Sequence, residues 1–126
     1  MEKNVINPTS PYDSTQYGFP HAIKANGTTT IHCAGQIAWD KEYKHVGADD
    51  IGAQAEQSLS NLKTVLTEAG TRVAEVVRMR TYVVGHKPEY LEPAGTAIAE
   101  FYGETPPGQY LDWCAEFNLA RLYDRN

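Results

Sequence analysis

The chain lacks the features that mark several common classes of protein. Its two cysteines, Cys33 and Cys114, are too few and too far apart for a disulfide framework or a Cys-x-x-Cys metal site, so we interpret both as reduced thiols. No apolar run approaches the ~20 residues of a membrane-spanning helix, and the N-terminal residues contain no apolar core of a secretory signal. We therefore expect a cytoplasmic protein with no membrane partner.

Positive charge is also scarce. The 11 lysines and arginines are outnumbered by 16 acidic residues, which gives a formal net charge of −5 and a pI near 5.3. Proteins that bind nucleic acids neutralise the phosphate backbone with clustered Lys and Arg. We therefore expect no nucleic acid among the partners.

Motifs for catalysis or metal binding are missing from the sequence. His32 and Cys33 are adjacent on a predicted strand, so their side chains point to opposite faces and cannot hold one metal together. His21, His45 and His86 occur singly, and we find no phosphate-binding glycine loop and no nucleophile, histidine and acid pattern. We expect neither a metal nor a cofactor.

What the sequence does contain is enough for one domain. A chain of 126 residues buries about two thirds of its unfolded surface in a single core. Residues 1–17 show little periodicity and are rich in turn-forming residues, which indicates an irregular arm that gains order against the domain or a neighbour. Residues 18–126 are predicted to form the single domain.

The segment Thr28 to Asp40 is the most informative part of the chain. It follows Asn26-Gly27, a pair typical of a type I′ turn, so His21–Ala25 and Thr28–Ala34 are predicted to form a β-hairpin. The strand then meets Gly35, and glycine is tolerated inside a strand mainly at a bulge or where a ligand or another backbone comes close. Both explanations for this glycine stay open.

Two helices and two further strands follow. Apolar residues at spacings of three and four predict a helix between Asp49 and Gly70 and a second over Pro88–Tyr102. Period-two alternation predicts strands over Val76–Val84 and Leu111–Leu119. We predict an α+β fold in which two helices pack on one face of a mixed sheet. The apolar face of the second helix is expected to contain Leu91, Ala94, Ile98 and Phe101.

The predicted strand Val76–Val84 places Arg78, Arg80 and Tyr82 on one face. Two arginines on one sheet face could bind an anion, and they are also typical of a face that is simply solvated. The sequence alone leaves both interpretations open.

A set of ordered motifs resembles one known family. They cover roughly Gly18 to Gly108 of the chain, and together they are similar to the YjgF family of reactive-intermediate deaminases, which includes the RidA-like proteins described as endoribonuclease L-PSP. The matching motifs are Gly18–Lys24 (GFPHAIK), Ala34–Ile37 (AGQI), Gly47 with Asp50–Gln54 (DIGAQ), Glu68–Gly70 (EAG) and Ala99–Gly103 (AEFYG).

The resemblance implies a fold similar to Bacillus-type chorismate mutase and a homotrimer with its clefts between subunits. Active members hydrolyse enamines and imines to a 2-keto acid and ammonia without a cofactor, as 2-iminobutanoate/2-iminopropanoate deaminases. Their key group is an arginine in a Pro-Ala-Arg sequence, because a guanidinium grips the substrate carboxylate through two charge-assisted hydrogen bonds.

The chain departs from the family at this site. Pro107-Gly108-Gln109 occupies the Pro-Ala-Arg position, and Gln109 carries no charge. A family tyrosine is replaced by Phe19, a serine by Ala34, and a cysteine by Leu111. Phe19, Ala34, Gly35, Gln109 and Leu111 are therefore the candidate ligand-binding residues of the cleft, and no catalytic residue is assigned.

Three functions remain in competition. The leading hypothesis is a trimer whose cleft binds a small carboxylate- or carbonyl-bearing metabolite without the usual imine deaminase activity. The second is a hydrolase or deaminase that uses other cleft residues, and the third is a ribonuclease or translation inhibitor, which the acidic charge disfavours.

The C-terminal strand is altered relative to the family. From Gly108 onward the resemblance ends, although the family continues through two strands. The codons of Gly108 to Cys114, read as though one base had been inserted before them, permit Ala-Asn-Thr-Trp-Ile-Gly-Val, which resembles the continuation in relatives that lack the arginine. We hypothesise a frameshifted tail; the alternative is a divergent natural strand, which the period-two pattern supports. Neither version has an arginine at position 109.

Overall fold

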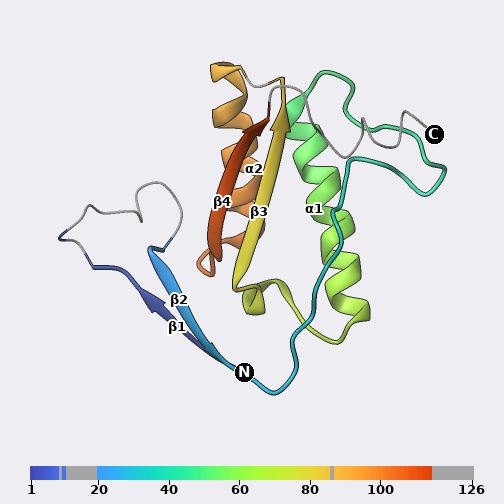
Figure 1. The fold of residues 1–126 in the computed structure, drawn as a ribbon. Coiled ribbons are helices and arrows are strands. Elements are labelled where there is room, and N and C mark those ends of the chain that lie inside the picture. The colour runs from blue at the N-terminus through green and yellow to red at the C-terminus, as the bar shows by residue number, and fades with distance from the viewer. Residues whose placement is uncertain (9, 11–19, 86, 115–126) are drawn as a thin grey trace.

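The computed structural model describes all residues except 9, 11–19, 86 and 115–126, and it confirms the α+β class (Figure 1). Two helices and four strands make up its main elements. Short 3-10 turns precede β3 at Val73–Glu75 and α2 at Pro88–Tyr90. In chain order the main elements are β1 (Glu2–Ile6), β2 (Ala22–Asn26), α1 (Ile51–Glu68), β3 (Arg78–Val84), α2 (Leu91–Tyr102) and β4 (Gly108–Cys114).

Helix α1 begins and ends where the sequence predicts. Asp50 is its N-cap, and a side-chain oxygen of Asp50 accepts a hydrogen bond from the Ala53 backbone N–H at 3.1 Å. Such a cap satisfies one of the backbone donors that the first turn of a helix leaves unpaired. Gly70 follows the helix with a φ of +81°, a conformation that glycine adopts without strain. The predicted apolar face is confirmed by the burial of Leu59 and Leu66.

Helix α2 packs against α1 and completes the core. Its buried residues Ala97, Ile98 and Tyr102 form one cluster with Leu59 of α1, and Met79 of β3 packs against this cluster. Gly103, with a φ of +57°, ends the helix as predicted. The prediction for Leu91 is wrong. Leu91 is 52% exposed because the 3-10 turn Pro88–Tyr90 precedes it and α2 turns its inward face only from Ala94 onward.

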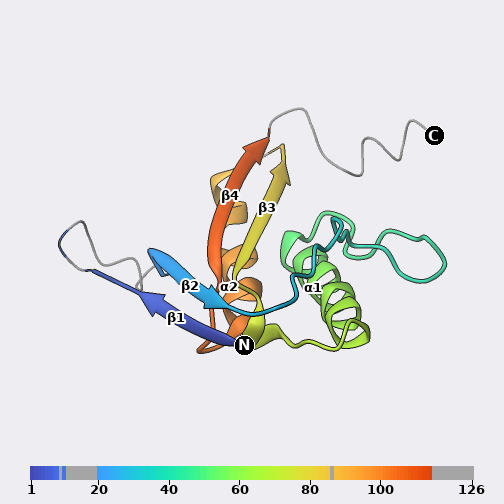
Figure 2. The same ribbon diagram turned by 60° about the horizontal axis from the view of Figure 1, so that its bottom comes forward.

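Strands β3 and β4 form a parallel pair in front of α2 (Figures 1 and 2). Their register places Met79 opposite Gln109 and Val84 opposite Cys114. Side chains alternate along β3 as predicted, with Arg78, Arg80 and Tyr82 exposed and Val83 buried. The last predicted strand is confirmed as far as Cys114, and its continuation to Leu119 lies outside the described residues.

The N-terminal hairpin prediction is wrong in its pairing partner. Strand β2 pairs antiparallel with β1, with Val5 opposite Ile23, and not with the residues after Asn26-Gly27. Residues 28–37, called the 28–37 segment below, contain neither helix nor strand. Among the described residues, the strands form two two-stranded sheets, β1 with β2 and β3 with β4. The turn signal at Asn26-Gly27 is local, whereas a strand takes whichever partner the whole fold brings alongside it.

Strand β1 also corrects the prediction of an irregular arm over its first residues. Strand β1 contacts the rest of the domain, because Lys3 Nζ donates hydrogen bonds to the backbone oxygens of Ala74 and Val76, both at 2.9 Å. Partial burial lowers the pKa of the Lys3 ammonium by removing part of its hydration.

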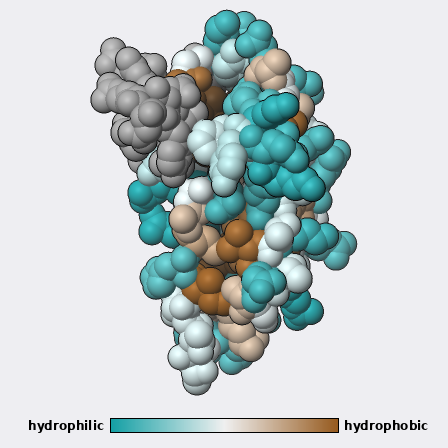
Figure 3. All heavy atoms as spheres, turned by 90° about the vertical axis from the view of Figure 1, so that its right-hand side faces the viewer, coloured by the Kyte–Doolittle hydropathy of each residue, from teal (hydrophilic) through white to brown (hydrophobic). Residues whose placement is uncertain are grey.

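The 28–37 segment is attached to the helical part at its C-terminal end. Asn61 of α1 donates from Nδ2 to the backbone oxygens of Ile37, at 3.0 Å, and Trp39, at 2.9 Å. Figure 2 shows the segment leaving β2 and running to α1, away from β3. On the α1 side, a cluster of hydrophobic side chains is exposed among hydrophilic ones (Figure 3).

Candidate functional site

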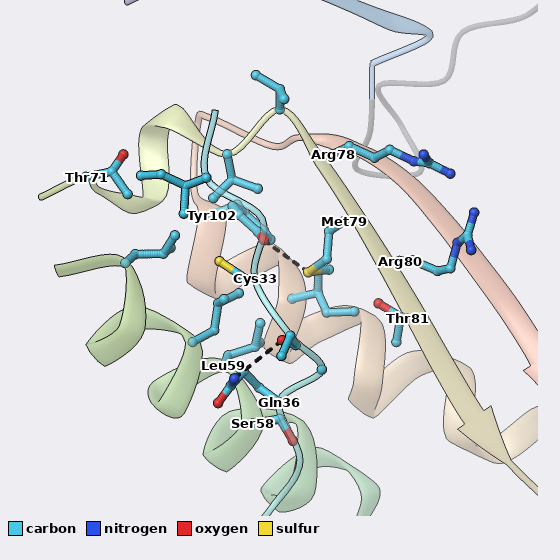
Figure 4. Close-up of a pocket in the computed structure, with 18 of the residues that line it drawn as sticks. Cys33, Gln36, Ser58, Leu59, Thr71, Arg78, Met79, Arg80, Thr81 and Tyr102 are labelled. Carbon is cyan, nitrogen blue, oxygen red and sulfur yellow. Dashed lines mark hydrogen bonds between the residues drawn. The ribbon is translucent and has the colours of Figure 1, made fainter. Parts of the chain in front are cut away.

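A cavity of about 1260 Å³ separates the 28–37 segment from β3. One wall consists of residues in the range 25–39 and the opposite wall of residues 75–84. Apolar residues from α1 and α2 form the floor, among them Leu59 and Ile98 (Figure 4). The cavity is therefore the place where the N-terminal region, both helices and β3 meet.

Tyr102 and Met79 meet at the floor of the cavity. The Tyr102 hydroxyl donates a hydrogen bond to Met79 Sδ at 3.0 Å (Figure 4). Burial is the main cause that raises the pKa of the Tyr102 hydroxyl far above its usual range, and the nearby Cys33 thiol raises it further when ionised. Tyr102 is therefore a neutral hydrogen-bond donor at any physiological pH.

The rest of the lining includes polar side chains from several elements, and some of them already have partners. Gln36 Nε2 donates to the Ala34 backbone oxygen at 3.4 Å, and Thr71 Oγ1 donates to Glu75 Oε2 at 2.6 Å. The Thr71 hydrogen bond, followed by the charge of Arg72, holds the pKa of the Glu75 carboxyl below its usual range. A carboxylate held ionised in this way is a weak general acid at neutral pH.

Arg78 and Arg80 extend from β3 on the side opposite Met79 (Figure 4). Arg80 Nη1 donates to the Tyr82 hydroxyl at 3.1 Å, which keeps that guanidinium beside a ring on the same exposed face. This arrangement places both cations outside the apolar floor. The two arginines could bind an anion or simply form a solvated face, and the structure is compatible with both.

The predicted site residues fall into two groups that one chain does not bring together. Ala34 and Gly35 are exposed and line the cavity. Gln109 and Leu111 lie on β4, at the register positions of Met79 and Thr81, so β3 stands between them and the cavity. Phe19 lies outside the described residues. A ligand could contact both groups only if it extended across β3 or if a second copy of the chain supplied one of the groups.

The histidines do not combine into a metal site within the part of the chain that the structure describes. Over that part, no group of three or more His, Cys, Asp or Glu side chains lies close enough to hold a metal ion. His45 forms an isolated bridge with Trp39, His32 is exposed, and the predicted position His86 lies outside the described residues. Among the same described residues, the structure contains no helix long and apolar enough to cross a membrane.

Sequence reasoning missed Tyr102 and Met79 as cavity residues. A signal for Tyr102 was available, because it follows Ile98 at a spacing of four and so belongs to the same helical face. Met79 could be assigned to one face of β3, but not to a particular aromatic neighbour, because its partner comes from an element 23 residues away.

The architecture is that of a single α+β fold class, with two helices beside two pairs of strands. The family model described as Endoribonuclease L-PSP matches residues 9–111, most of the chain. The chain therefore belongs to the YjgF/Rid family, which this model represents. The matched region ends at Leu111, close to Gly108, where the motif resemblance ends.

Known structures and proteins agree with this assignment. A protein of unknown function of the conserved Rid family, YyfB from Yersinia pestis, is 42% identical, with a TM-score of 0.84 over 95% of this chain and 90% of that one. Yeast Mmf1 shares the fold, with a TM-score of 0.64 at 19% identity, over 91% of this chain and 82% of that one.

Two curated relatives extend the similarity. The mitochondrial protein mmf1 of Schizosaccharomyces pombe is 38% identical over 64% of this chain, which spans 46% of mmf1. A RutC family protein of Pyrococcus horikoshii is 29% identical over 85% of this chain and 76% of its own length. The chain thus spans just under half of the first relative and about three quarters of the second.

Proposed function

We propose that this protein is a homotrimer whose clefts between subunits bind a small metabolite with a carboxylate or carbonyl group, without deaminating imines by the family's usual route. The observation that carries the proposal is Gln109 at the second position of β4, where the family resemblance places an arginine. A neutral amide offers hydrogen bonds but no charge, so it cannot replace a bidentate grip on a carboxylate.

Two titratable groups of the cavity are poor candidates for acid–base catalysis. The floor is apolar, and the lining also contains hydroxyl, thiol and amide groups, the imidazole of His45, the guanidinium groups of Arg78 and Arg80, and the Glu75 carboxylate that Thr71 engages. General acid–base catalysis requires a group whose pKa is near the working pH and that lies within hydrogen-bond reach of the substrate. Neither Tyr102 nor Glu75 meets the first condition.

The trimer explains how the two groups of site residues could meet. Ala34 and Gly35 lie on one side of β3 and β4 lies on the other, so a neighbouring subunit is the simple way to complete one cleft. The exposed hydrophobic residues Val77, just before β3, and Tyr82, on β3, favour such a contact, because an association buries them. Light scattering should give the mass of three chains, and a mass of one chain contradicts this part of the proposal.

An assay with 2-aminoacrylate generated in place by a dehydratase tests the missing activity. We expect the same rate of pyruvate release with and without the protein, while a family member that carries the arginine accelerates it. Gln109→Arg should strengthen the binding of pyruvate in a titration, since the variant restores the charge. Clear acceleration by the unmodified protein, abolished in Gln109→Ala, overturns the proposal.

A hydrolase that acts on a neutral or cationic substrate through other cleft residues is the alternative within the enzyme class. Thermal shifts against a metabolite panel separate the two, because a ligand that binds only the native protein raises its apparent stability. Stabilisation by carboxylates favours the binding role. Stabilisation confined to neutral or cationic compounds, together with their turnover, favours the hydrolase.

A ribonuclease or translation inhibitor is the third candidate, because the matching family model carries the description of an endoribonuclease. The net charge of −5 argues against RNA binding, since neutralisation of phosphates by Lys and Arg supplies most of the affinity for nucleic acids. We expect filter binding to single-stranded RNA without saturation or salt dependence. Saturable, salt-sensitive binding with cleavage favours the ribonuclease instead.

The cytoplasmic location stays a prediction.

A further inference from the structure

Strand β3 has two arginines on one exposed face. Arg78 and Arg80 alternate with the half-buried residues Met79 and Thr81, and both arginines are exposed. Their guanidinium groups extend to the same side of the strand, away from the apolar floor of the cavity (Figure 4). Alternate residues of a strand lie ~6.6 Å apart, two steps of ~3.3 Å. A protein with a net charge of −5 therefore places two positive charges side by side on this face.

Tyr82 fixes the direction of one of the two guanidinium groups. Arg80 Nη1 donates to the Tyr82 hydroxyl at 3.1 Å, and Tyr82 lies two residues further along the same face. A guanidinium that is already oriented loses less conformational entropy when it binds a carboxylate. The hydrogen bond therefore preorganises Arg80 for an anion.

The surroundings of Arg78 leave room for a ligand. Gly108, which has no side chain, is the partner of Arg78 in the register with β4. Among the described residues, no acidic side chain forms an ion pair with Arg78. The acidic residue of β4, Asp112, stands opposite Tyr82, beyond Arg80 as seen from Arg78. An anion therefore has access to Arg78 from the side of β4.

Association of subunits makes a counter-ion necessary, and this step rests on the trimer proposed above. That trimer buries Tyr82, and the hydrogen bond to Tyr82 brings Arg80 into the same contact. Burial of a charge is costly unless the charge is paired and hydrogen-bonded. Two cations at this spacing also repel each other more strongly once water is excluded. An anion that neutralises both arginines removes both costs.

The two arginines also select the kind of anion. A guanidinium is planar and binds a carboxylate through two parallel N–H···O hydrogen bonds. Arginines at alternate positions of a strand offer two such forks, which start ~6.6 Å apart. A dicarboxylate with a short carbon chain supplies one carboxylate to each fork, whereas a monocarboxylate engages only one.

We propose that Arg78 and Arg80 form a binding site for a short dicarboxylate on the exposed face of β3, closed by the neighbouring subunit. The site supplies from β3 the positive charge that Gln109 does not supply from β4. It narrows the proposed metabolite from any compound with a carboxylate or carbonyl group to one with two carboxylates.

Calorimetric titration of the full-length protein with succinate, propionate and inorganic phosphate tests the site. We expect succinate to bind at least tenfold more tightly than propionate or phosphate. Arg78→Gln and Arg80→Gln should each lower the affinity for succinate at least tenfold. Arg72→Gln is the matched control, because it removes the same charge from an exposed arginine outside β3 and should leave this affinity unchanged.

Replacement of both arginines by lysine separates charge from geometry. Arg78→Lys and Arg80→Lys, combined in one variant, keep both charges and remove both planar forks. The affinity for succinate should fall at least threefold, while light scattering still gives the mass of the unmodified assembly. An unchanged affinity in this variant contradicts the two-fork geometry.

Three further results overturn the proposal while light scattering shows an intact trimer. The first is equal affinity for succinate and propionate in the unmodified protein. The second is unchanged succinate affinity in Arg78→Gln and Arg80→Gln. The third is phosphate binding as tight as succinate binding, which identifies a general anion site. A mass of one chain contradicts the trimer instead, and succinate binding that still depends on both arginines then supports the arginine site by itself.

Discussion

The helical part of the molecule and its N-terminal region differ in where their stability comes from. The helical part, which comprises α1, β3, α2 and β4, contains the buried core around Leu59 and Ile98. The N-terminal region, which comprises β1, β2 and the 28–37 segment, is exposed along almost its whole length. Burial of apolar surface dominates folding free energy, so the helical part should unfold last. The N-terminal region should open locally at low cost.

Truncation of a core residue should have the largest effect. Leu59→Ala removes a buried side chain at the contact between α1 and α2 and should lower the free energy of unfolding by about 2–5 kcal/mol. Val5→Ala on β1, where the side chain is 53% exposed, should cost less than about 0.5 kcal/mol. Urea unfolding of both variants measures the contrast. Equal losses would mean that β1 belongs to the cooperative core.

One glycine substitution should destabilise the joint between the regions and another should not. Gly47 has a φ of +97°, and an added Cβ would lie 2.9 Å from the Gln54 backbone nitrogen. Gly47→Ala should therefore lower the unfolding free energy by about 2 kcal/mol. Gly95→Ala, inside α2 with open space around the position, should stabilise the protein by about 0.5–1 kcal/mol. Thermal unfolding tests the opposite signs.

Removal of the Lys3 contact should open the N-terminal region without unfolding the rest. Lys3→Met loses the hydrogen bonds to Ala74 and Val76, which should cost about 1 kcal/mol. Amides of β1 and β2 should exchange faster, while those of α1 stay protected. Lys24→Met, at an exposed position of β2, is the control. Faster exchange throughout α1 would contradict the separation of the two regions.

The effect expected at Tyr102 depends on pH and is absent at neutral pH. Because burial raises the pKa of its hydroxyl, the folded state keeps the proton when the unfolded chain releases it above pH ~10. The corresponding stability is fully present below pH ~10 and is lost as pH rises toward the folded pKa, by up to about 1.4 kcal/mol per pH unit. Tyr102→Phe should lack this alkaline loss, measured by urea unfolding between pH 9 and pH 11 against the matched variant Tyr43→Phe. An identical alkaline loss in Tyr102→Phe would show that the hydroxyl is not buried.

The two regions also differ in how well the sequence predicted them. Helix α1 was predicted almost to the residue, because Asp50, Gly70 and the apolar spacing between them act within the helix itself. The hairpin around Asn26-Gly27 was predicted wrongly, since β2 takes β1 as its partner. Leu91 was misplaced because a 3-10 turn shifts the phase of α2 at its start.

The candidate site was predictable only as a set of positions. Motif order located Gly35 and Gln109, and the family assignment that rests on those motifs is confirmed. Their separation by β3 could not be predicted, because it depends on which edge of β3 receives β4. The sequence alone shows that Gln109 carries no charge. Only the structure shows how Gln109 lies relative to Gly35.

The sequence by itself determined the two helices, both ends of α1 and the C-terminal end of α2, the alternation along β3 and the family. Each of these depends on interactions within a few residues or on ordered motifs. Only the tertiary structure decided that β2 pairs with β1, that the 28–37 segment has no strand structure, and that a cavity separates this segment from β3. The physical reason is that a helix pairs its backbone groups within its own turns, whereas a strand must find them on another segment.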